Sequence, residues 1–116
     1  MNLPKFHIGP MSKNIVDTIT DFNNVSSNSF GLIPSRRQVE FDGGYVNGWT
    51  TESFYNYVSG KSLITRDHSG PGQGLVDDDG YESLKYDCKF FDIIHIDPWK
   101  AFNDINSGIR KTLEMI

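Results

Sequence analysis

The chain has 116 residues, 37% of them hydrophobic and 22% charged, with a formal net charge of −4. This length suits one domain, and the acidic balance argues against a general nucleic-acid binder, which needs a basic surface. No apolar run approaches the roughly 20 residues of a membrane helix, and Lys5 and His7 interrupt any N-terminal signal peptide. The single cysteine, Cys88, excludes an internal disulfide, and we expect it to pack. These features predict a cytoplasmic protein with no membrane or nucleic-acid partner.

The first half of the chain predicts two strand-and-helix units. Residues 6–8 form a short apolar run, and Ser12 then precedes apolar residues at helical spacing, as a helix cap does. Residues 30–33 form the second apolar run, followed by a long turn with paired glycines and a helix capped at Thr50 or Thr51. Each unit is therefore expected to be a strand followed by a helix with an apolar face.

The second half repeats this pattern. Residues 62–65 predict a third strand, which a glycine-rich turn and the acidic run 77–79 separate from a helix that carries Tyr81. We expect the acidic side chains to cap that helix, because a helix N-terminus favours negative charge. Residues 91–96 predict a fourth strand. The helix after it has one apolar face, formed by Ile105, Ile109, Leu113 and Ile116.

Four such units in succession indicate the α/β class, with parallel strands joined by right-handed crossovers. Two folds have this rhythm: the N-terminal half of a (β/α)8 TIM barrel, and a small flavodoxin-like doubly wound sheet. A complete barrel has about 250 residues. The first fold therefore makes residues 1–116 a single partial barrel domain, truncated relative to a full barrel. Both folds place their site at the carboxyl ends of the strands.

Polar and charged side chains gather at the ends of three predicted strands. They are Ser35, Arg36, Arg37 and Gln38 after the second strand, Arg66, Asp67 and His68 after the third, and His95, Asp97 and Lys100 at the fourth. In an α/β sheet these positions meet at one rim. The sequence therefore predicts a functional site at this rim, although polar loops alone produce a similar pattern.

Asp67 and His68 are the most specific pair. The imidazole can bind a divalent metal and the carboxylate can act as a general acid or base, so Asp67 is the candidate catalytic residue and His68 the candidate ligand. The alternative is a turn-capping aspartate beside a surface histidine. His95 is a second candidate ligand and alternates with Asp97, but it lies between two isoleucines. A buried, hydrogen-bonded histidine is therefore its competing interpretation.

The turn GPGQG, residues 70–74, matches neither a P-loop nor a dinucleotide-binding fingerprint. Its glycines indicate a tight turn or a close approach of the backbone. Basic side chains are better candidates for binding phosphate, because they make charge-assisted hydrogen bonds, and exposed salt links are their alternative role. The candidates are Arg36, Arg37, Arg66 and Lys100.

Three segments in order resemble the tagatose-bisphosphate aldolase non-catalytic subunit family, which is related to class II aldolases. They are RQVEFDGGY after the second strand, RDHSGPGQG after the third, and IIHIDPWK in the fourth. The resemblance covers residues 30–100. The matching positions are Gln38, Val39, Gly43, Gly44, Tyr45, Asp67, His68, Gly70, Pro71, His95 and Asp97.

This resemblance implies a (β/α)8 barrel and an aldolase-like protein of carbohydrate metabolism. By the same resemblance, Asp67 would transfer protons and His68 would belong to the site of a divalent metal, which we expect to be zinc. The implied substrate is a phosphorylated sugar, a ketose bisphosphate. The residues expected to bind it are Arg37, Gln38, Gly43, Gly44, Arg66, Asp97 and Lys100.

Members of this family are described as accessory subunits, so two functions stay open. One is a metal-dependent ketose-bisphosphate aldolase, a lyase. The other is a non-enzymatic subunit that stabilises a class II aldolase and binds its sugar phosphate. The remaining metal histidines of class II aldolases come from later strands that this chain lacks. Four units also leave sheet edges unpaired, so we expect a catalytic aldolase subunit or a second half-barrel chain as partner.

Overall fold

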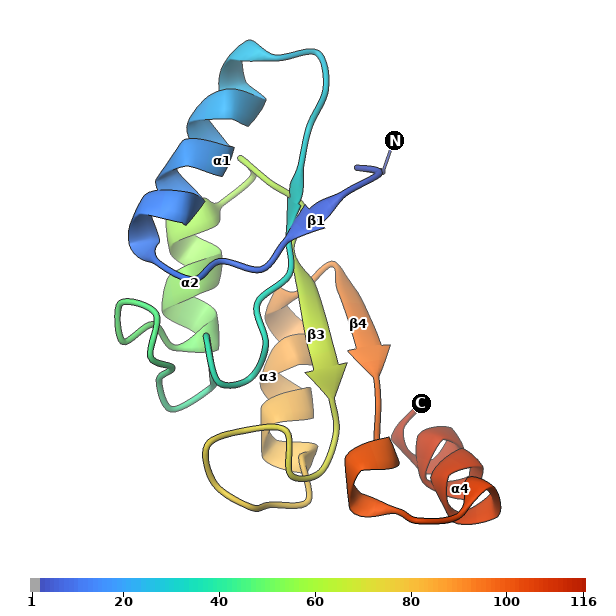
Figure 1. The fold of residues 1–116 in the computed structure, drawn as a ribbon. Coiled ribbons are helices and arrows are strands. Elements are labelled where there is room, and N and C mark those ends of the chain that lie inside the picture. Colours follow the sequence, from blue (N-terminus) through green and yellow to red (C-terminus); the bar gives the residue numbers. More distant parts are fainter. Residues whose placement is uncertain (1–2) are drawn as a thin grey trace.

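The computed structural model describes residues 3–116, in which strands and helices alternate (Figure 1). These residues form β1 (His7–Ile8), α1 (Lys13–Val25), β2 (Gly31–Leu32), α2 (Thr51–Val58), β3 (Thr65–Ser69), α3 (Tyr81–Phe90), β4 (Ile93–Ile96), a short 3-10 helix η1 (Trp99–Ala101) and α4 (Ile105–Met115). The order confirms the predicted α/β class, since every strand is followed by a helix.

Two helices begin where the sequence predicts, and each start has a local cause. The Ser12 hydroxyl accepts a hydrogen bond from the Ile15 amide at the start of α1. At the start of α2, Thr50 and Ser53 form a capping box, in which each side chain accepts from the backbone amide of the other. Such caps satisfy amides that have no partner inside the helix, and each contributes about 1 kcal/mol.

The start of α3 combines a glycine with the predicted acidic residues. Gly80 occupies the N-cap with φ of 78°, and it has no side chain to cap the helix. The carboxylates before it contact the backbone instead: Asp78 accepts from the Gly80 amide and Asp79 from the Tyr81 amide, both at 3.0 Å. The acidic run therefore does bond to the opening of α3, while the cap position itself is glycine.

The strands are parallel, as predicted, and neighbours in the chain are neighbours in space. β1 pairs with β2, and β3 pairs with β4. Isolated parallel bridges from Leu32 to Ile64 and from Ser35 to Asp67 connect the two small sheets. A flavodoxin-like sheet would place β1 between β2 and β3, which is not the arrangement of these strands.

The helices α1, α2 and α3 lie on one side of the strands, and the other side is open (Figure 1). A buried apolar cluster fills the layer between helices and strands; it consists of Val16, Leu32, Val39, Val46, Trp49, Phe54, Val58, Ile64 and Phe91. Along β4 the residues alternate, with Ile94 packed against this cluster and Ile93 and His95 exposed. The open face of β4 therefore presents one apolar and one imidazole side chain to solvent.

The third strand differs from its predicted bounds. Residues 62–65 were expected to form it, but β3 begins at Thr65 and runs through Asp67 to Ser69. Backbone pairing on both sides explains the shift, because β3 pairs with β4 on one side and the Asp67 amide donates to the Pro34 carbonyl on the other. The charged residues thus belong to the strand itself rather than to a loop beyond it.

One expectation about burial is wrong, because Cys88 is exposed rather than packed. The apolar face of α4 is exposed, with exposed fractions of 70% at Ile105, 48% at Ile109 and 69% at Leu113. In Figure 1, α4 lies away from α1 and α2, and it contacts the start of α3 through Lys111, which donates to the Tyr81 hydroxyl. Across residues 3–116, the structure contains no helix with the length and apolar character needed to cross a membrane.

Candidate functional site

A β-bulge brings the most specific sequence motif together. Between Arg66 and Ser69 the register of β3 slips against β4, so that Asp67 and His68 both lie opposite the single residue His95. His68 adopts a positive φ of 51°, which is uncommon for a residue other than glycine. In a regular strand two successive side chains point to opposite faces, whereas a bulge redirects one of them. The bulge therefore places three metal-ligand side chains together.

Three donor atoms converge at this bulge. Asp67 Oδ1 lies 3.3 Å from His68 Nε2 and 4.0 Å from His95 Nδ1. One ligand atom from each of the three residues lies within 4.8 Å of the other two, and the imidazole centroids are 5.0 Å apart. His95 is 55% exposed, so the alternative of a buried histidine does not hold. The predicted residues Asp67, His68 and His95 thus share one site.

The fourth member of the site is Asp97, whose Oδ2 lies 2.6 Å from His68 Nδ1. Carboxylates therefore face both nitrogens of one imidazole ring. A neutral imidazole carries a single N–H, so it can donate to only one of the two carboxylates. The lone pair of the other ring nitrogen then points at a carboxylate oxygen, and the two repel each other unless a proton or a metal ion lies between them. This arrangement attracts a cation.

The donors suit a divalent metal of the zinc type. Two imidazole nitrogens and one carboxylate oxygen are typical zinc ligands, and catalytic zinc sites have three protein ligands with a further position open. The donors are spread somewhat more widely than around a filled zinc ion, but the exposed His95 ring can turn toward the other two donors. The residues present therefore fit the metal that the motifs imply.

The glycine-rich turn packs against the end of β4. A Cβ added to Gly70 would lie 2.2 Å from the Asp97 carbonyl oxygen, so only glycine fits there. Gln73 Nε2 also donates to that carbonyl at 3.3 Å. The predicted close approach of the backbone is therefore an approach to Asp97.

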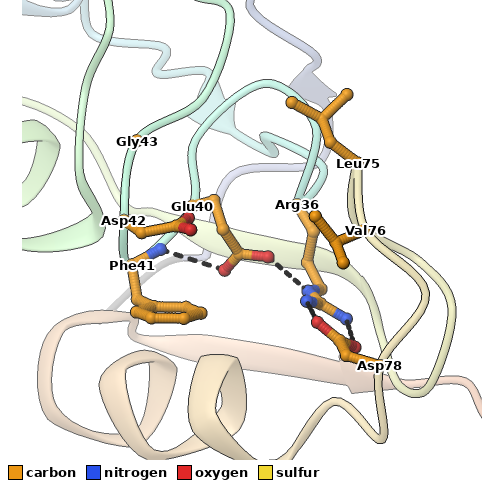
Figure 2. A pocket seen from close by; sticks show the side chains of 8 residues that line it. All are labelled: Arg36, Glu40, Phe41, Asp42, Gly43, Leu75, Val76 and Asp78. Atoms are coloured by element: carbon orange, nitrogen blue, oxygen red, sulfur yellow. Dashed lines mark hydrogen bonds and ion pairs between the residues drawn. The ribbon is translucent and has the colours of Figure 1, made fainter.

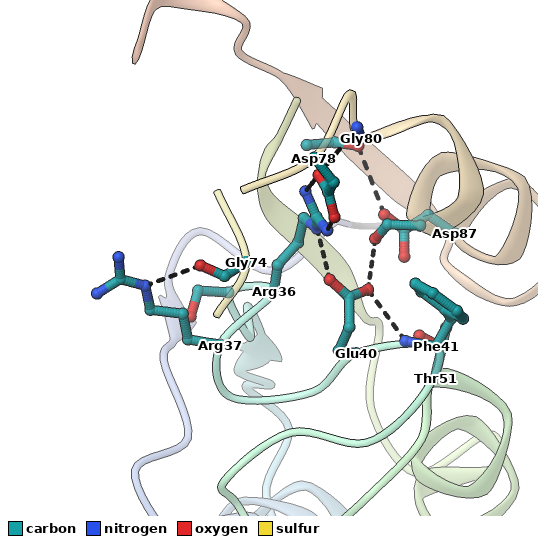
Figure 3. Close-up of polar contacts among 12 residues, drawn as sticks. Arg36, Arg37, Glu40, Phe41, Thr51, Gly74, Asp78, Gly80 and Asp87 are labelled. Carbon is teal, nitrogen blue, oxygen red and sulfur yellow. Dashed lines mark hydrogen bonds and ion pairs between the residues drawn. The ribbon is translucent and has the colours of Figure 1, made fainter. Parts of the chain in front are cut away.

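Arg36 is a buried structural cation. Its guanidinium donates to Glu40 and to both oxygens of Asp78 (Figures 2 and 3). It also donates to the Gly70 carbonyl at 2.9 Å. The ion pair lowers the pKa of Asp78. Arg36, Glu40 and Asp78 line a cavity of about 260 Å³ together with Phe41 (Figure 2). Because the guanidinium is 1% exposed and already paired, we assign Arg36 to the fold rather than to phosphate binding.

Arg66 is also buried, which corrects the expectation that it binds substrate. Its Nε and Nη2 donate to the Asp87 carboxylate at 2.9 to 3.0 Å, and Nη1 donates to the Pro34 carbonyl. The guanidinium also lies over the Phe91 ring, 4.5 Å from its centroid. Its side chain is fully buried. Within residues 3–116, no buried side-chain nitrogen or oxygen lacks a hydrogen-bond partner, so this pair is complete.

Gln38 is buried and bonded within the chain, which corrects its expected place at the substrate, whereas the expected substrate contacts of the partly exposed Gly43 and Gly44 stay a prediction. The buried Gln38 side chain accepts a hydrogen bond from the Ser35 amide at 2.9 Å. Gly43 has a positive φ of 112°, and a Cβ on Gly44 would lie 2.1 Å from the Gln38 carbonyl oxygen. These glycines shape the turn after β2.

Arg37 and Lys100 do lie together, as the phosphate hypothesis requires. Both line a cavity of about 330 Å³ that includes backbone of the glycine-rich turn. Arg37 Nε donates to the Gly74 carbonyl at 3.3 Å (Figure 3), which leaves its terminal nitrogens for a ligand. Asp77 lines the same cavity and opposes an anion there. The cavity therefore holds two cations and one carboxylate.

Comparisons of the chain with protein-family models, with curated proteins and with solved structures found no match. The chemistry of the site must therefore be argued from its own residues. The strongest feature is the cluster at the bulge, which brings together Asp67, His68, His95 and Asp97, four residues that the sequence predicts at one rim of the sheet.

Proposed function

We propose that the chain binds a divalent metal ion, zinc by its donor set, at His68 and His95, and acts on a phosphorylated sugar by aldol cleavage, with Asp67 beside the metal as the proton-transfer residue. The observation that carries this proposal is the β-bulge that places Asp67 and His68 opposite His95 on the open face of the sheet. A bulge with a residue at positive φ costs stability, and such strain is concentrated at functional sites.

In this proposal the chain's own residues have distinct roles. His68 and His95 hold the metal, which supplies a Lewis acid that polarises a carbonyl oxygen when bound. Asp67 accepts, at a carboxylate oxygen, the proton of the hydroxyl next to the carbon–carbon bond that breaks. The open sheet face lets a polar substrate reach these groups without passing through the apolar core.

The phosphate end of the substrate is assigned to Arg37 and Lys100. Their cavity adjoins the glycine-rich turn that follows β3, and the same turn packs on Asp97 of the metal cluster. Terminal guanidinium nitrogens and an ammonium group are suited to phosphate oxygens. A sugar phosphate is therefore the substrate class that the two neighbouring sites favour.

The motif resemblance supports a ketose bisphosphate and a barrel of the class II aldolase kind. The sequential order of four parallel strands, with three helices on one side, agrees with half of such a barrel. We infer this finer fold from the strand order together with the three motifs.

The second candidate function is an accessory subunit of a catalytic aldolase. The exposed apolar stripe on α4, at Ile105, Ile109 and Leu113, favours it, because such a stripe suits contact with another protein. The partner in this version is a catalytic aldolase subunit or a second half-barrel chain. The metal cluster would then bind the sugar phosphate without turning it over.

Titration of zinc into the purified chain tests the metal site by calorimetry. We expect one ion per chain in the parent and no measurable binding in His68→Ala. His7→Ala is the matched control, because His7 lies outside the cluster and contacts Thr65. Unchanged affinity in His68→Ala would exclude the site.

A coupled aldolase assay with a panel of ketose bisphosphates, run alone and with a catalytic subunit, separates the two functions. The enzyme version requires metal-dependent cleavage that Asp67→Asn abolishes. If the chain alone cleaves none of the substrates but raises the activity of a catalytic subunit, the accessory version is correct.

A further inference from the structure

We propose that Asp97 is a positioning residue that fixes His68 in the tautomer with hydrogen on Nδ1, so that Nε2 faces Asp67 and His95 with a free lone pair. The inference deepens the proposed function and rests on it in one respect: the tautomer serves metal binding only if His68 is a metal ligand. It reassigns Asp97, which the sequence placed among the substrate-binding residues. The carrying contact is the 2.6 Å approach of Asp97 Oδ2 to His68 Nδ1.

Asp97 is held in place through every polar group it has. Its Oδ1 accepts from the Trp99 amide at 3.0 Å, and its own amide donates to the Ser69 carbonyl at 2.7 Å. Its carbonyl oxygen accepts from Gln73. The side chain is only 17% exposed. The carboxylate is therefore a fixed acceptor at the end of β4 rather than a mobile surface group.

His68 needs such an acceptor, because little else restrains its ring. The side chain is 47% exposed, and its backbone has the positive φ of the bulge. Metal-binding histidines commonly donate their second ring N–H to a carboxylate, which fixes the tautomer, orients the ring and raises the basicity of the ligating nitrogen. Asp97 stands where this partner is required.

The two carboxylates around His68 therefore have different tasks. Asp97 lies at 2.6 Å from Nδ1 and is anchored by Trp99, whereas Asp67 lies at 3.3 Å from Nε2 and belongs to the donor cluster. We infer that Asp97 accepts the ring hydrogen on Nδ1 through the shorter contact. The longer contact between Asp67 and Nε2 leaves room for an ion. The glycine-rich turn keeps this order, because Gly70 packs directly on the Asp97 backbone.

The first test uses the metal-free chain. Long-range nitrogen–proton correlation spectra in mildly alkaline buffer report which nitrogen of His68 carries hydrogen. We expect the Nδ1–H tautomer in the parent and a shift toward Nε2–H in Asp97→Ala. Asp21→Asn, which removes an exposed carboxylate on α1, is the control and should leave the tautomer unchanged. An Nε2–H ring in the parent, or an unchanged ring in Asp97→Ala, overturns the proposal.

The second test is zinc titration of the same variants. We expect Asp97→Ala to bind zinc about 10- to 100-fold more weakly. Asp97→Asn should show a smaller loss, because its single carbonyl oxygen can accept from His68 or from the Trp99 amide but not from both. Thermal unfolding of the variants identifies a merely structural role, which would lower the melting temperature and leave zinc affinity unchanged.

The spectroscopic test and the zinc titration together distinguish failure of this inference from failure of the proposed function. If the parent binds no zinc but its tautomer depends on Asp97, the metal proposal fails and the positioning role stands. If the parent binds zinc and Asp97→Ala keeps both affinity and tautomer, the metal site stands and the positioning role fails.

Discussion

Arg66 and His68 lie on the same strand with one residue between them, yet they face opposite environments. The Arg66 guanidinium is fully buried among the helices, bonded to Asp87 and stacked on Phe91. His68 is half exposed on the open side of the sheet, with one ring nitrogen facing Asp97 and the other facing Asp67. A buried cation with a complete set of partners maintains the fold, whereas an exposed ring between two carboxylates is available to a ligand.

The largest expected effect tests the buried side of this comparison. Arg66→Met leaves the Asp87 carboxylate buried without its partner, so we expect a loss of about 3–5 kcal/mol in the free energy of unfolding. Urea denaturation measures it. The double variant Arg66→Met with Asp87→Leu should recover most of the loss, because an apolar pair needs no compensating charge. A single variant as stable as the parent would place Arg66 outside the structural framework.

Gly70→Ala tests the connection between the two sides. The new Cβ would overlap backbone of Asp97, so we expect a destabilisation of about 1–3 kcal/mol together with weaker zinc binding. Thermal unfolding and zinc titration measure the two effects. Gly9→Ala is the control, since a Cβ there meets its nearest atom at 3.8 Å, an ordinary contact. Equal behaviour of the two variants would argue against close packing at Asp97.

The cavity of Arg37 and Lys100 tests the open side. We expect Arg37→Ala and Lys100→Ala each to weaken binding of inorganic phosphate roughly fivefold, or about 1 kcal/mol, because exposed charge pairs contribute little more. Asp77→Asn should strengthen binding, since it removes the one carboxylate that lines the cavity. Calorimetric titration measures all three, with Lys5→Ala as control. Phosphate binding that no variant alters would remove the anion site.

An effect of similar size is expected on the pH dependence of stability. Arg36 lowers the pKa of Asp78 in the folded chain below the value of about 3.9 for an unfolded aspartate. The ionised carboxylate therefore stabilises the fold at neutral pH, and this contribution is lost as pH falls through the lowered pKa. Asp78→Asn should cost about 1 kcal/mol at neutral pH and nothing in strong acid. Urea denaturation at several pH values measures the difference, which must shrink on acidification.

Much of the fold followed from local sequence features. Ser12 and Thr50 cap α1 and α2 because a side-chain oxygen can satisfy a free amide within the same turn. Short apolar runs predicted the strands, and apolar residues at helical spacing predicted the helices between them. The bounds of β3 did not follow, because its pairing depends on β4 and on the segment after β2, which are remote in the chain.

The sequence predicted which residues belong to the candidate site, but it did not predict how their side chains are arranged. Asp67, His68 and His95 stood out by residue type at strand ends, where parallel strands bring them together. The bulge that turns Asp67 and His68 to one side is a property of the pairing between two strands. The contact between His68 and Asp97 spans 29 positions of the chain, so its existence could not be inferred from the motif itself.

The sequence by itself determined the alternation of strands and helices and the gathering of acids and histidines at one end of the sheet, because both depend on local spacing. Only the tertiary structure decided which charged side chains are buried and which are exposed. Arg36 and Arg66 became buried because Asp78 and Asp87, 42 and 21 positions away, came within hydrogen-bond distance. His68 stayed exposed because the helices cover only the other side of the sheet, which leaves its ring between two carboxylates and open to a ligand.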